Sequence, residues 1–288
     1  MPIAPSNDIE LYYETHGDPA DPALLLVNGF SSQILGWFDG FREALAERGR
    51  FVISFDNRDV GLSTHLDGID VDLAAIGAGT AQAPYDLSTF ALDAVGLLDH
   101  LGVDKAHIAG SSMGGMIVQQ MAIDHPDRVA TLTSIMSTTG EPDYFQSAPE
   151  AMAALRSPQP SERSAFIERA VSSRHIFGSK RYVDDDAVAA QAGASFDRMY
   201  YPEGLARQTA AIRASGDRAE GLRKLQTPTL VIHGRDDTLI LPSGGERTAE
   251  LVPGANLLML SDMGHDLPKP LWPLIVDAMI SHSTHAIG

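Results

Sequence analysis

Mainly apolar runs alternate with helically spaced apolar residues along the first 140 positions of the chain. The runs have the composition of strands buried on both faces of a sheet, and they lie at 24–27, 51–55, 106–109 and 129–135. Between them, residues 38–45 and 87–101 repeat apolar positions at helical spacing, and a glycine lies shortly beyond each segment. This alternation predicts an α/β protein with a mostly parallel central sheet and helices on both faces.

The pattern changes at residue 141 and returns at residue 225. Residues 141–224 contain helical segments, for example near 166–171 and 205–212, but no convincing strand. Strand patterns resume at 228–234 and 256–260, and 271–282 fits a closing helix. We therefore expect a core made of residues 1–140 and 225–288, with residues 141–224 inserted as a helical cap. Ligands of such sheets bind beyond the carboxyl ends of the strands, so the cap is expected to lie over the site.

Composition and charge narrow the class of protein. A content of 44% hydrophobic and 20% charged residues is ordinary for a soluble globular chain. We expect no membrane insertion, because no apolar run approaches the ~18 residues of a membrane span, and a cytoplasmic location, because no signal peptide is visible. The absence of cysteine excludes disulfides, thiolate metal sites and a cysteine nucleophile. The formal net charge of −17 argues against nucleic acid as a partner.

One short motif carries the main chemical prediction. Gly110-Ser111-Ser112-Met113-Gly114 has the form G-x-S-x-G and lies between a predicted strand and a predicted helix. In that context the central serine lies on a strained turn at the tip of the sheet and at a helix N-terminus, where developing negative charge is stabilised. We predict that Ser112 is a nucleophile, because only Ser112 has a glycine two positions away on either side.

A serine nucleophile needs a base, and the base needs a carboxylate. Of the ten histidines, His265 follows the last predicted strand, at the edge where Ser112 is expected. His233 ends a strand, but the glycine after it suggests packing at a turn. Two adjacent aspartates follow that strand, and the Gly-x-x-Asp spacing favours Asp237 over Asp236. The chain order Ser112, Asp237, His265 is the order of α/β hydrolases.

The oxyanion of an acyl-transfer intermediate requires two preorganised donors. We predict that they are the backbone N–H groups of Met113, at the helix start, and of Phe30, in the turn after the first buried strand. In the segment 56–63, Asp56 and Arg58 are predicted to brace loops near that turn rather than to line the pocket. No dinucleotide, phosphate-loop or metal-ligand spacing is present, so no cofactor and no metal are expected.

These motifs together resemble the α/β-hydrolase superfamily over nearly the whole chain outside the cap. Within it, the stretches 17–27, 56–63 and 264–268 are similar to aclacinomycin methylesterases and mycobacterial LipG-like esterases. Two positions depart from the commonest superfamily pattern: Asn28 stands where histidine is usual, and Asp59 stands where glycine is usual. The subgroup shares the aspartate. The resemblance implies hydrolysis of carboxylic esters.

The expected function is a serine carboxylic-ester hydrolase that works through an acyl-enzyme, as a monomer or homodimer. The small-molecule substrate is expected to be a medium-sized, largely apolar ester, such as a polyketide-type methyl ester or a macrocyclic lactone. Six cap residues either line its pocket or pack the cap: Phe166, Phe177, Phe196, Met199, Tyr200 and Tyr201. The alternatives are a C–C bond or thioester hydrolase with the same three residues, and a small-molecule receptor on this fold.

Overall fold

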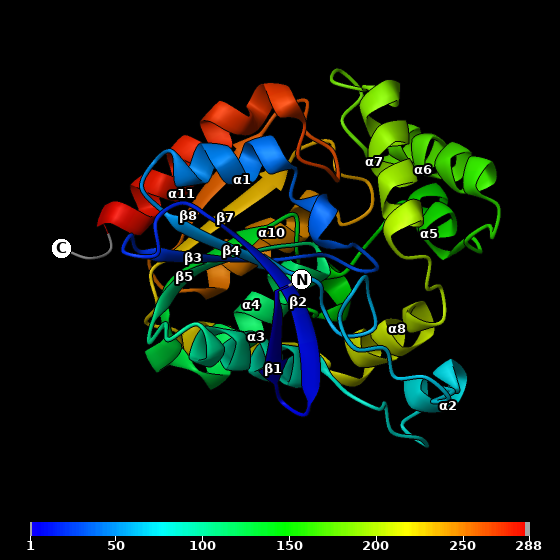
Figure 1. The fold of residues 1–288 in the computed structure, drawn as a ribbon, viewed down its shortest axis with the longest axis horizontal. Coiled ribbons are helices and arrows are strands. Elements are labelled where there is room, and N and C mark those ends of the chain that lie inside the picture. The colour runs from blue at the N-terminus through cyan, green and yellow to red at the C-terminus, as the bar shows by residue number, and fades with distance from the viewer. Residues whose placement is uncertain (1, 286–288) are drawn as a thin grey trace.

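The computed structural model describes residues 2–285, and Figure 1 shows how they fold. One eight-stranded sheet crosses the molecule. Its strands are β1 (Ile3–Ser6), β2 (Ile9–His16), β3 (Ala23–Val27), β4 (Phe51–Phe55), β5 (Ala106–Ser111), β6 (Val129–Ile135), β7 (Thr229–Gly234) and β8 (Asn256–Leu260). The α-helices are α1 (Asp39–Ala46), α2 (Leu73–Gly77), α3 (Leu87–His100), α4 (Met113–Asp124), α5 (Pro149–Arg156), α6 (Arg163–Phe177), α7 (Asp185–Arg198), α8 (Gly204–Ala214), α9 (Ala219–Lys224), α10 (Pro242–Leu251) and α11 (Trp272–His285). Short 3-10 turns occur at Ile34–Gly36, Pro126–Arg128, Pro142–Tyr144 and Lys269–Leu271.

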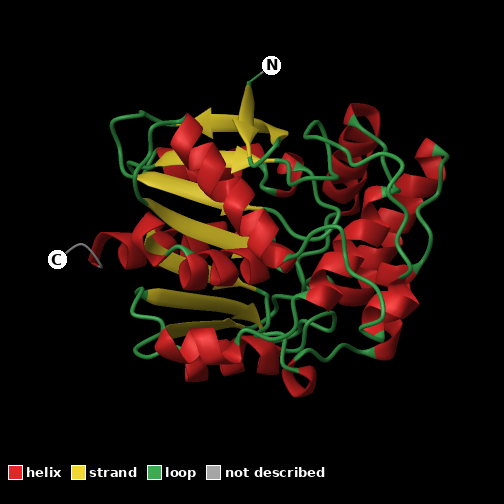
Figure 2. Ribbon diagram, turned by 90° about the horizontal axis from the view of Figure 1, so that it is seen from below, coloured by secondary structure: helices red, strands yellow, loops and turns green. Residues whose placement is uncertain are grey.

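The order of strands in the sheet is β1-β2-β4-β3-β5-β6-β7-β8. The pairs β1–β2 and β2–β4 are antiparallel, and every later pair is parallel. Because β3, β5, β6 and β7 run in one direction, their carboxyl ends meet at one edge of the sheet. In Figure 2 this edge faces the separate group of helices from the insertion.

Two apolar layers cover the sheet. Helices α3 and α4 pack on one face and bury residues such as Phe90 and Ile117, whereas α1 and α11 pack on the other and bury Phe41 and Ile275. Strands β3 and β4 are buried at every position. A strand with both faces covered must be apolar throughout, which is why these segments stand out in the sequence. The predicted α/β class with a mostly parallel sheet is confirmed.

Residues 141–224, between β6 and β7, contain the helices α5 to α9 and no strand. We refer to this segment as the insertion. Helices α5, α6 and α7 contact one another in series and lie beside the sheet edge (Figure 1). Helices α8 and α9 contribute differently, because Ala211, Ala219 and Leu222 belong to the larger core cluster. Among residues 2–285, no helix is both long enough and apolar enough to cross a membrane.

Two parts of the fold differ from the sequence expectations. The antiparallel strands β1 and β2 were not predicted, because the alternation of buried and exposed positions in β2 is irregular. The short helix α2, in the segment that joins β4 to α3, was not predicted either. There Asp72 caps a short helix, since its Oδ1 accepts hydrogen bonds from the N–H groups of Ala74 and Ala75, both at 2.9 Å.

Candidate active site

Ser112 lies on a strained turn between β5 and α4. Its backbone has φ 56° and ψ −120°, an uncommon conformation for any residue other than glycine. The turn is so tight that a Cβ atom on Gly110 would lie 2.1 Å from the carbonyl oxygen of Gly114, and one on Gly114 would lie 2.1 Å from that of Val27. The two glycines therefore allow strand, helix and neighbouring strand to approach closely, and the serine side chain is left half-exposed at the tip.

Three of the predicted side chains form one hydrogen-bonded row. Ser112 Oγ lies 3.0 Å from Nε2 of His265, and Nδ1 of the same ring lies 2.7 Å from Oδ2 of Asp237. Because an ionised carboxylate only accepts hydrogen bonds, Nδ1 carries the ring proton, and the lone pair of Nε2 faces the serine hydroxyl. The row thus has the polarity that a general base beside a nucleophile needs.

Asp237 is held as an ionised, buried carboxylate. Its Oδ1 accepts the backbone N–H groups of Leu239 and Ile240, both at 2.9 Å. Burial alone would raise the pKa of this carboxyl, but the facing rings of His265 and His233 outweigh burial and lower the pKa to about 2. The neighbouring Asp236 is exposed. Of the two competing aspartates, the one selected by the spacing contacts the histidine.

The two predicted oxyanion donors come from segments next to the serine. The amide of Met113 is the first of α4, where helix geometry provides no internal acceptor. The turn that carries Phe30 passes close to the nucleophile, since a Cβ atom on Gly29 would lie 3.2 Å from Cβ of Ser112. Within residues 2–285, neither amide N–H has a protein acceptor. Both can therefore donate to a bound oxygen.

The insertion holds the loop that carries His265. The backbone N–H of His265 donates to the carbonyl oxygen of Phe177 at 2.7 Å, and that of Gly264 donates to Ser179 Oγ at 3.0 Å. Ser179 in turn donates through its N–H to Oδ1 of Asp266 at 3.0 Å. The Phe177 ring also meets the His265 ring edge-on, with 6.2 Å between centroids. The end of α6 is therefore part of the wall around the base.

Four further aromatic residues of the insertion contact one another or the core. The rings of Phe166, Phe196 and Tyr200 form one cluster, with centroid separations of 4.9 to 6.1 Å. Tyr201 stacks on His65 at 3.8 Å. Of the six candidate pocket residues in the insertion, Phe177 is the one whose ring contacts the ring of His265.

Buried ion pairs brace the loops behind the site. Asp56 Oδ1 accepts the N–H of Ile34 at 2.6 Å, and Oδ2 pairs with Arg198 of α7 at 2.7 Å. Arg58 forms a two-point ion pair with Asp93 of α3. This is the bracing that the sequence predicts for Asp56 and Arg58.

Asp59, which replaces the usual glycine, forms a second two-point pair with Arg207 of α8, with both contacts at 2.8 Å. The side chains of the two residues are 0% and 5% exposed. The aspartate at this position therefore connects the core to the insertion.

Sequence reasoning missed His233 as a neighbour of the site. Its ring is fully buried, with Nε2 2.9 Å from the carbonyl oxygen of Ile240 and 3.5 Å from Oδ2 of Asp237. Nε2–H therefore donates to that carbonyl and braces the loop that carries the carboxylate. A useful signal in the sequence is that His233 lies at the end of β7, four residues before Asp237.

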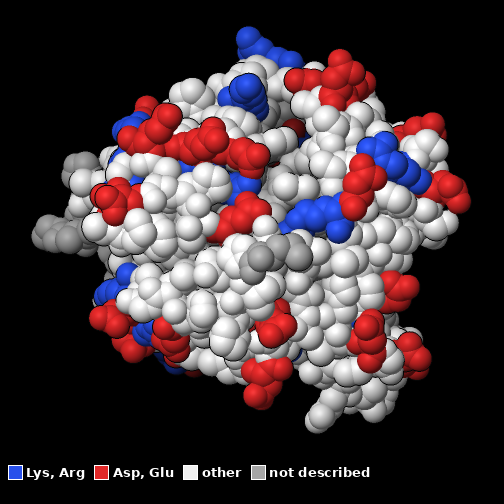
Figure 3. Space-filling model, viewed as in Figure 1, with Lys and Arg blue, Asp and Glu red and all other residues white. Residues whose placement is uncertain are grey.

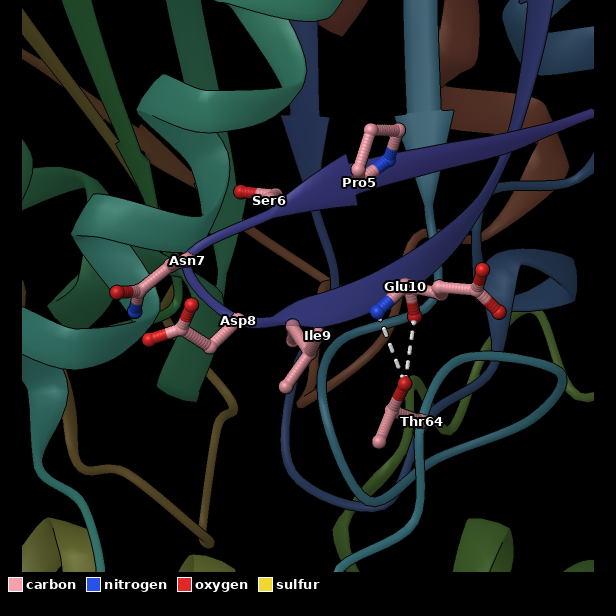
Figure 4. Close-up of a pocket in the computed structure, with 7 residues that line it drawn as sticks. All are labelled: Pro5, Ser6, Asn7, Asp8, Ile9, Glu10 and Thr64. Carbon is pink, nitrogen blue, oxygen red and sulfur yellow. Dashed lines mark hydrogen bonds between the residues drawn. The ribbon is translucent and has the colours of Figure 1, made fainter.

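One surface pocket contains no residue of the Ser112 row. Acidic side chains outnumber basic ones on the face in Figure 3, and the two kinds are dispersed over it. Figure 4 shows an open pocket at the β1–β2 turn, lined by residues 5–10 and Thr64, whose Oγ1 bonds the backbone of Glu10. None of its lining residues belongs to the Ser112 row. In the described part of the chain, no group of three or more acidic, histidine or cysteine side chains is arranged to hold a metal ion.

A strained serine at a strand–helix turn, with a histidine and an aspartate supplied from later strand ends, defines the active-site class of the α/β hydrolases. A sequence model of the alpha/beta hydrolase fold family matches residues 22–268, so the chain belongs to that family.

Among curated relatives, the chain is 28% identical to rhodomycin D methylesterase DauP of Streptomyces sp. (strain C5), over 97% of each chain. It is also 28% identical to rhodomycin D methylesterase DnrP of Streptomyces peucetius, over 98% of this chain and 97% of the relative. Among solved structures, a variant of a meta-cleavage product hydrolase (CumD) of Pseudomonas fluorescens superposes with a TM-score of 0.80 at 20% identity, covering 99% of this chain and 98% of that one.

Proposed function

We propose that this protein is a serine hydrolase that cleaves carboxylic esters through an acyl-enzyme. The observation that carries the proposal is the row formed by Ser112, His265 and Asp237, with contacts of 3.0 and 2.7 Å. The two full-length methylesterase relatives support an ester as the substrate. The serine has a base within hydrogen-bond distance, and that base has a buried carboxylate to hold its tautomer.

In the acylation half of the mechanism, Ser112 Oγ attacks the ester carbonyl carbon while its proton moves to Nε2 of His265. Asp237 stabilises the resulting imidazolium. The tetrahedral oxyanion accepts the N–H groups of Phe30 and Met113, and the loss of one such donor typically costs about 3 kcal/mol of barrier. The carbon–oxygen bond to the alcohol then breaks, the alcohol takes the proton from Nε2, and an ester remains on Ser112.

In the deacylation half, water attacks that ester and gives its proton to Nε2 of His265. The second tetrahedral oxyanion occupies the same two amides. Its collapse breaks the bond to Ser112 Oγ, which recovers the proton from the imidazolium. A carboxylic acid and the free enzyme result, and no cofactor takes part in any step.

The proposed substrate is a medium-sized, largely apolar ester, for which a polyketide-type methyl ester or a macrocyclic lactone fits best. The names of the two Streptomyces relatives support a methyl ester. Phe177, in edge contact with the base, supplies an apolar wall beside the reacting carbonyl. The negative net charge favours a neutral or cationic substrate over a polyanion.

Turnover of p-nitrophenyl acetate and butyrate tests the proposal. We expect many turnovers per enzyme, loss of activity in Ser112→Ala and retention in Ser111→Ala, which removes the adjacent hydroxyl as a matched control. Full activity in Ser112→Ala would refute the assignment of the nucleophile, and a single turnover would favour a receptor. Mass spectrometry then separates the substrates, because a lactone gains one water, whereas a methyl ester exchanges its methyl group for hydrogen.

A further inference from the structure

The turn that carries Phe30 is held by a side chain of the helical insertion. Ser31 follows Phe30 and has a φ of 56°, in the left-handed region that residues other than glycine seldom occupy. Its N–H donates to Oε1 of Gln208 in α8, at 2.9 Å. Gln208 is fully buried. The turn itself is closed by the N–H of Ser32, which donates to the carbonyl oxygen of Gly29 at 3.2 Å. The Gln208 contact adds a second support from a distant element at the residue with the unfavourable conformation.

Gln208 is itself fixed from behind. Its Nε2 donates to the carbonyl oxygen of Arg58 at 3.1 Å, so both ends of the amide are engaged and its orientation is defined. The guanidinium of Arg58 is paired with Asp93 of α3. The acceptor presented to Ser31 is therefore anchored to the rigid core through two successive contacts.

The hydrogen bond between Ser31 and Gln208 affects the direction of the neighbouring Phe30 N–H. The N–H of Ser31 belongs to the peptide unit that joins Phe30 to Ser31, and holding that unit restricts ψ of Phe30. The Phe30 amide lies in the preceding unit, so its direction depends on the conformation that the contact maintains. Oxyanion donors act because they are oriented before the reaction, and a small change in direction weakens them.

We infer that Gln208 is a positioning residue for the oxyanion hole, acting through Ser31 on the Phe30 N–H. This inference rests on the proposed function, and it makes α8 part of the catalytic apparatus. The insertion also contacts this segment further along, where Gln191 Nε2 donates to the carbonyl oxygen of Leu35 at 2.6 Å. Gln191 provides a matched control, because it is also a glutamine of the insertion and is also bonded to this loop. Its acceptor, Leu35, lies four residues beyond Ser31.

The test compares Gln208→Met with Gln191→Met. For p-nitrophenyl butyrate we expect Gln208→Met to lower kcat by about 10- to 100-fold with KM within about twofold of wild type. The reason is that the backbone N–H of Phe30 stabilises only the tetrahedral state. Gln191→Met should stay within about twofold of wild type in both constants. An equal loss in the two variants would overturn the inference, since it would show general loosening of the loop. So would an unchanged kcat in Gln208→Met.

A trifluoromethyl ketone gives a second readout. Ser112 Oγ adds to its carbonyl carbon, the serine proton moves to His265, and the new oxyanion occupies the hole. We expect Gln208→Met to weaken this adduct by the same factor as kcat, while binding of the butyrate product changes little. If Gln208→Met does not fold, Gln208→Asn replaces it, because its amide is one methylene too short to reach Ser31, and the same losses are expected.

The two proposals fail in different ways. Activity that survives in Ser112→Ala would refute the proposed function. If the wild type shows no ester turnover, fluorine NMR of the adduct still tests Gln208: a weaker adduct in Gln208→Met than in Gln191→Met supports the inference, and equal adducts overturn it.

Discussion

Replacing Asp237 by asparagine should reverse the proton arrangement of the base. Oδ1 of Asp237 accepts two backbone N–H groups, from Leu239 and Ile240. An asparagine amide must place its oxygen there, because an NH2 group in that position would face two donors. Its nitrogen then occupies the place of Oδ2, 2.7 Å from Nδ1 of His265. The ring must accept at Nδ1, carry its proton on Nε2 and point that proton at Ser112.

The cost follows from losing the base while the geometry is kept. A histidine in the wrong tautomer cannot accept the serine proton, and the corresponding change in a serine protease lowers kcat by about 10,000-fold. That factor equals about 5 kcal/mol of barrier. KM should change little, because the substitution alters no group that contacts the substrate. The fold should be retained, since the asparagine oxygen still caps the two backbone donors.

Steady-state hydrolysis of p-nitrophenyl butyrate measures this effect, with Asp236→Asn as the control. Asp236 is exposed, directly precedes Asp237 and loses the same charge, so its variant should have wild-type kcat. Circular dichroism should show that both variants are folded. A kcat of Asp237→Asn within tenfold of wild type would refute the tautomer argument, and an equal loss in both variants would show that charge alone matters.

Three further predictions concern the loops and their supports. Asp59→Asn leaves Arg207 buried without its charged partner, which should cost about 3–5 kcal/mol of stability, or about 5–8 °C in Tm by calorimetry. Burial raises the pKa of Asp59, but Arg207 outweighs burial and places the pKa in the folded protein below the usual 3.8. The ionised Asp59 therefore stabilises the fold fully above about pH 4, and this contribution is lost below that pH. The difference in Tm between wild type and Asp59→Asn should narrow in acid. A wild-type Tm, or a gap that widens in acid, would contradict this. Ser179→Ala should lower kcat about fivefold at constant KM, equivalent to the ~1 kcal/mol of one hydrogen bond that holds the His265 loop, and an unchanged kcat would exclude such a role. Gly110→Ala should give little folded protein on gel filtration, because its Cβ would lie 2.1 Å from a backbone carbonyl oxygen of α4; normal yield and activity would show that the turn can relax.

The buried strands and the Ser112 row were accessible from the sequence because each has a local signature. Strands covered on both faces are continuously apolar, so the central strands were predicted near their observed bounds. The serine has glycines at fixed spacing, and the aspartate and histidine directly follow strand ends. Because the carboxyl ends of parallel strands share one edge of the sheet, the three residues can be placed together from their order in the sequence, without knowledge of any contact.

The supports of the site were not accessible, because their partners are remote in sequence and of common residue types. The Gln208 contact spans 177 positions and the Ser179 contact with Gly264 spans 85. A buried glutamine in an amphipathic helix and a serine after another helix carry no spacing that distinguishes them from surface residues. Their significance depends on where two loops meet the insertion, which is a property of tertiary packing alone.

Since α6 bonds the segment around His265 and α8 bonds the segment around Phe30, the insertion cannot be exchanged as a neutral module. Transplanting residues 141–224 from a homologue to alter selectivity would also replace the contacts that hold the base and the oxyanion donor in place. Chimaeras should therefore turn over slowly even when the new pocket fits its ligand, until residues at these two junctions are matched to the recipient core.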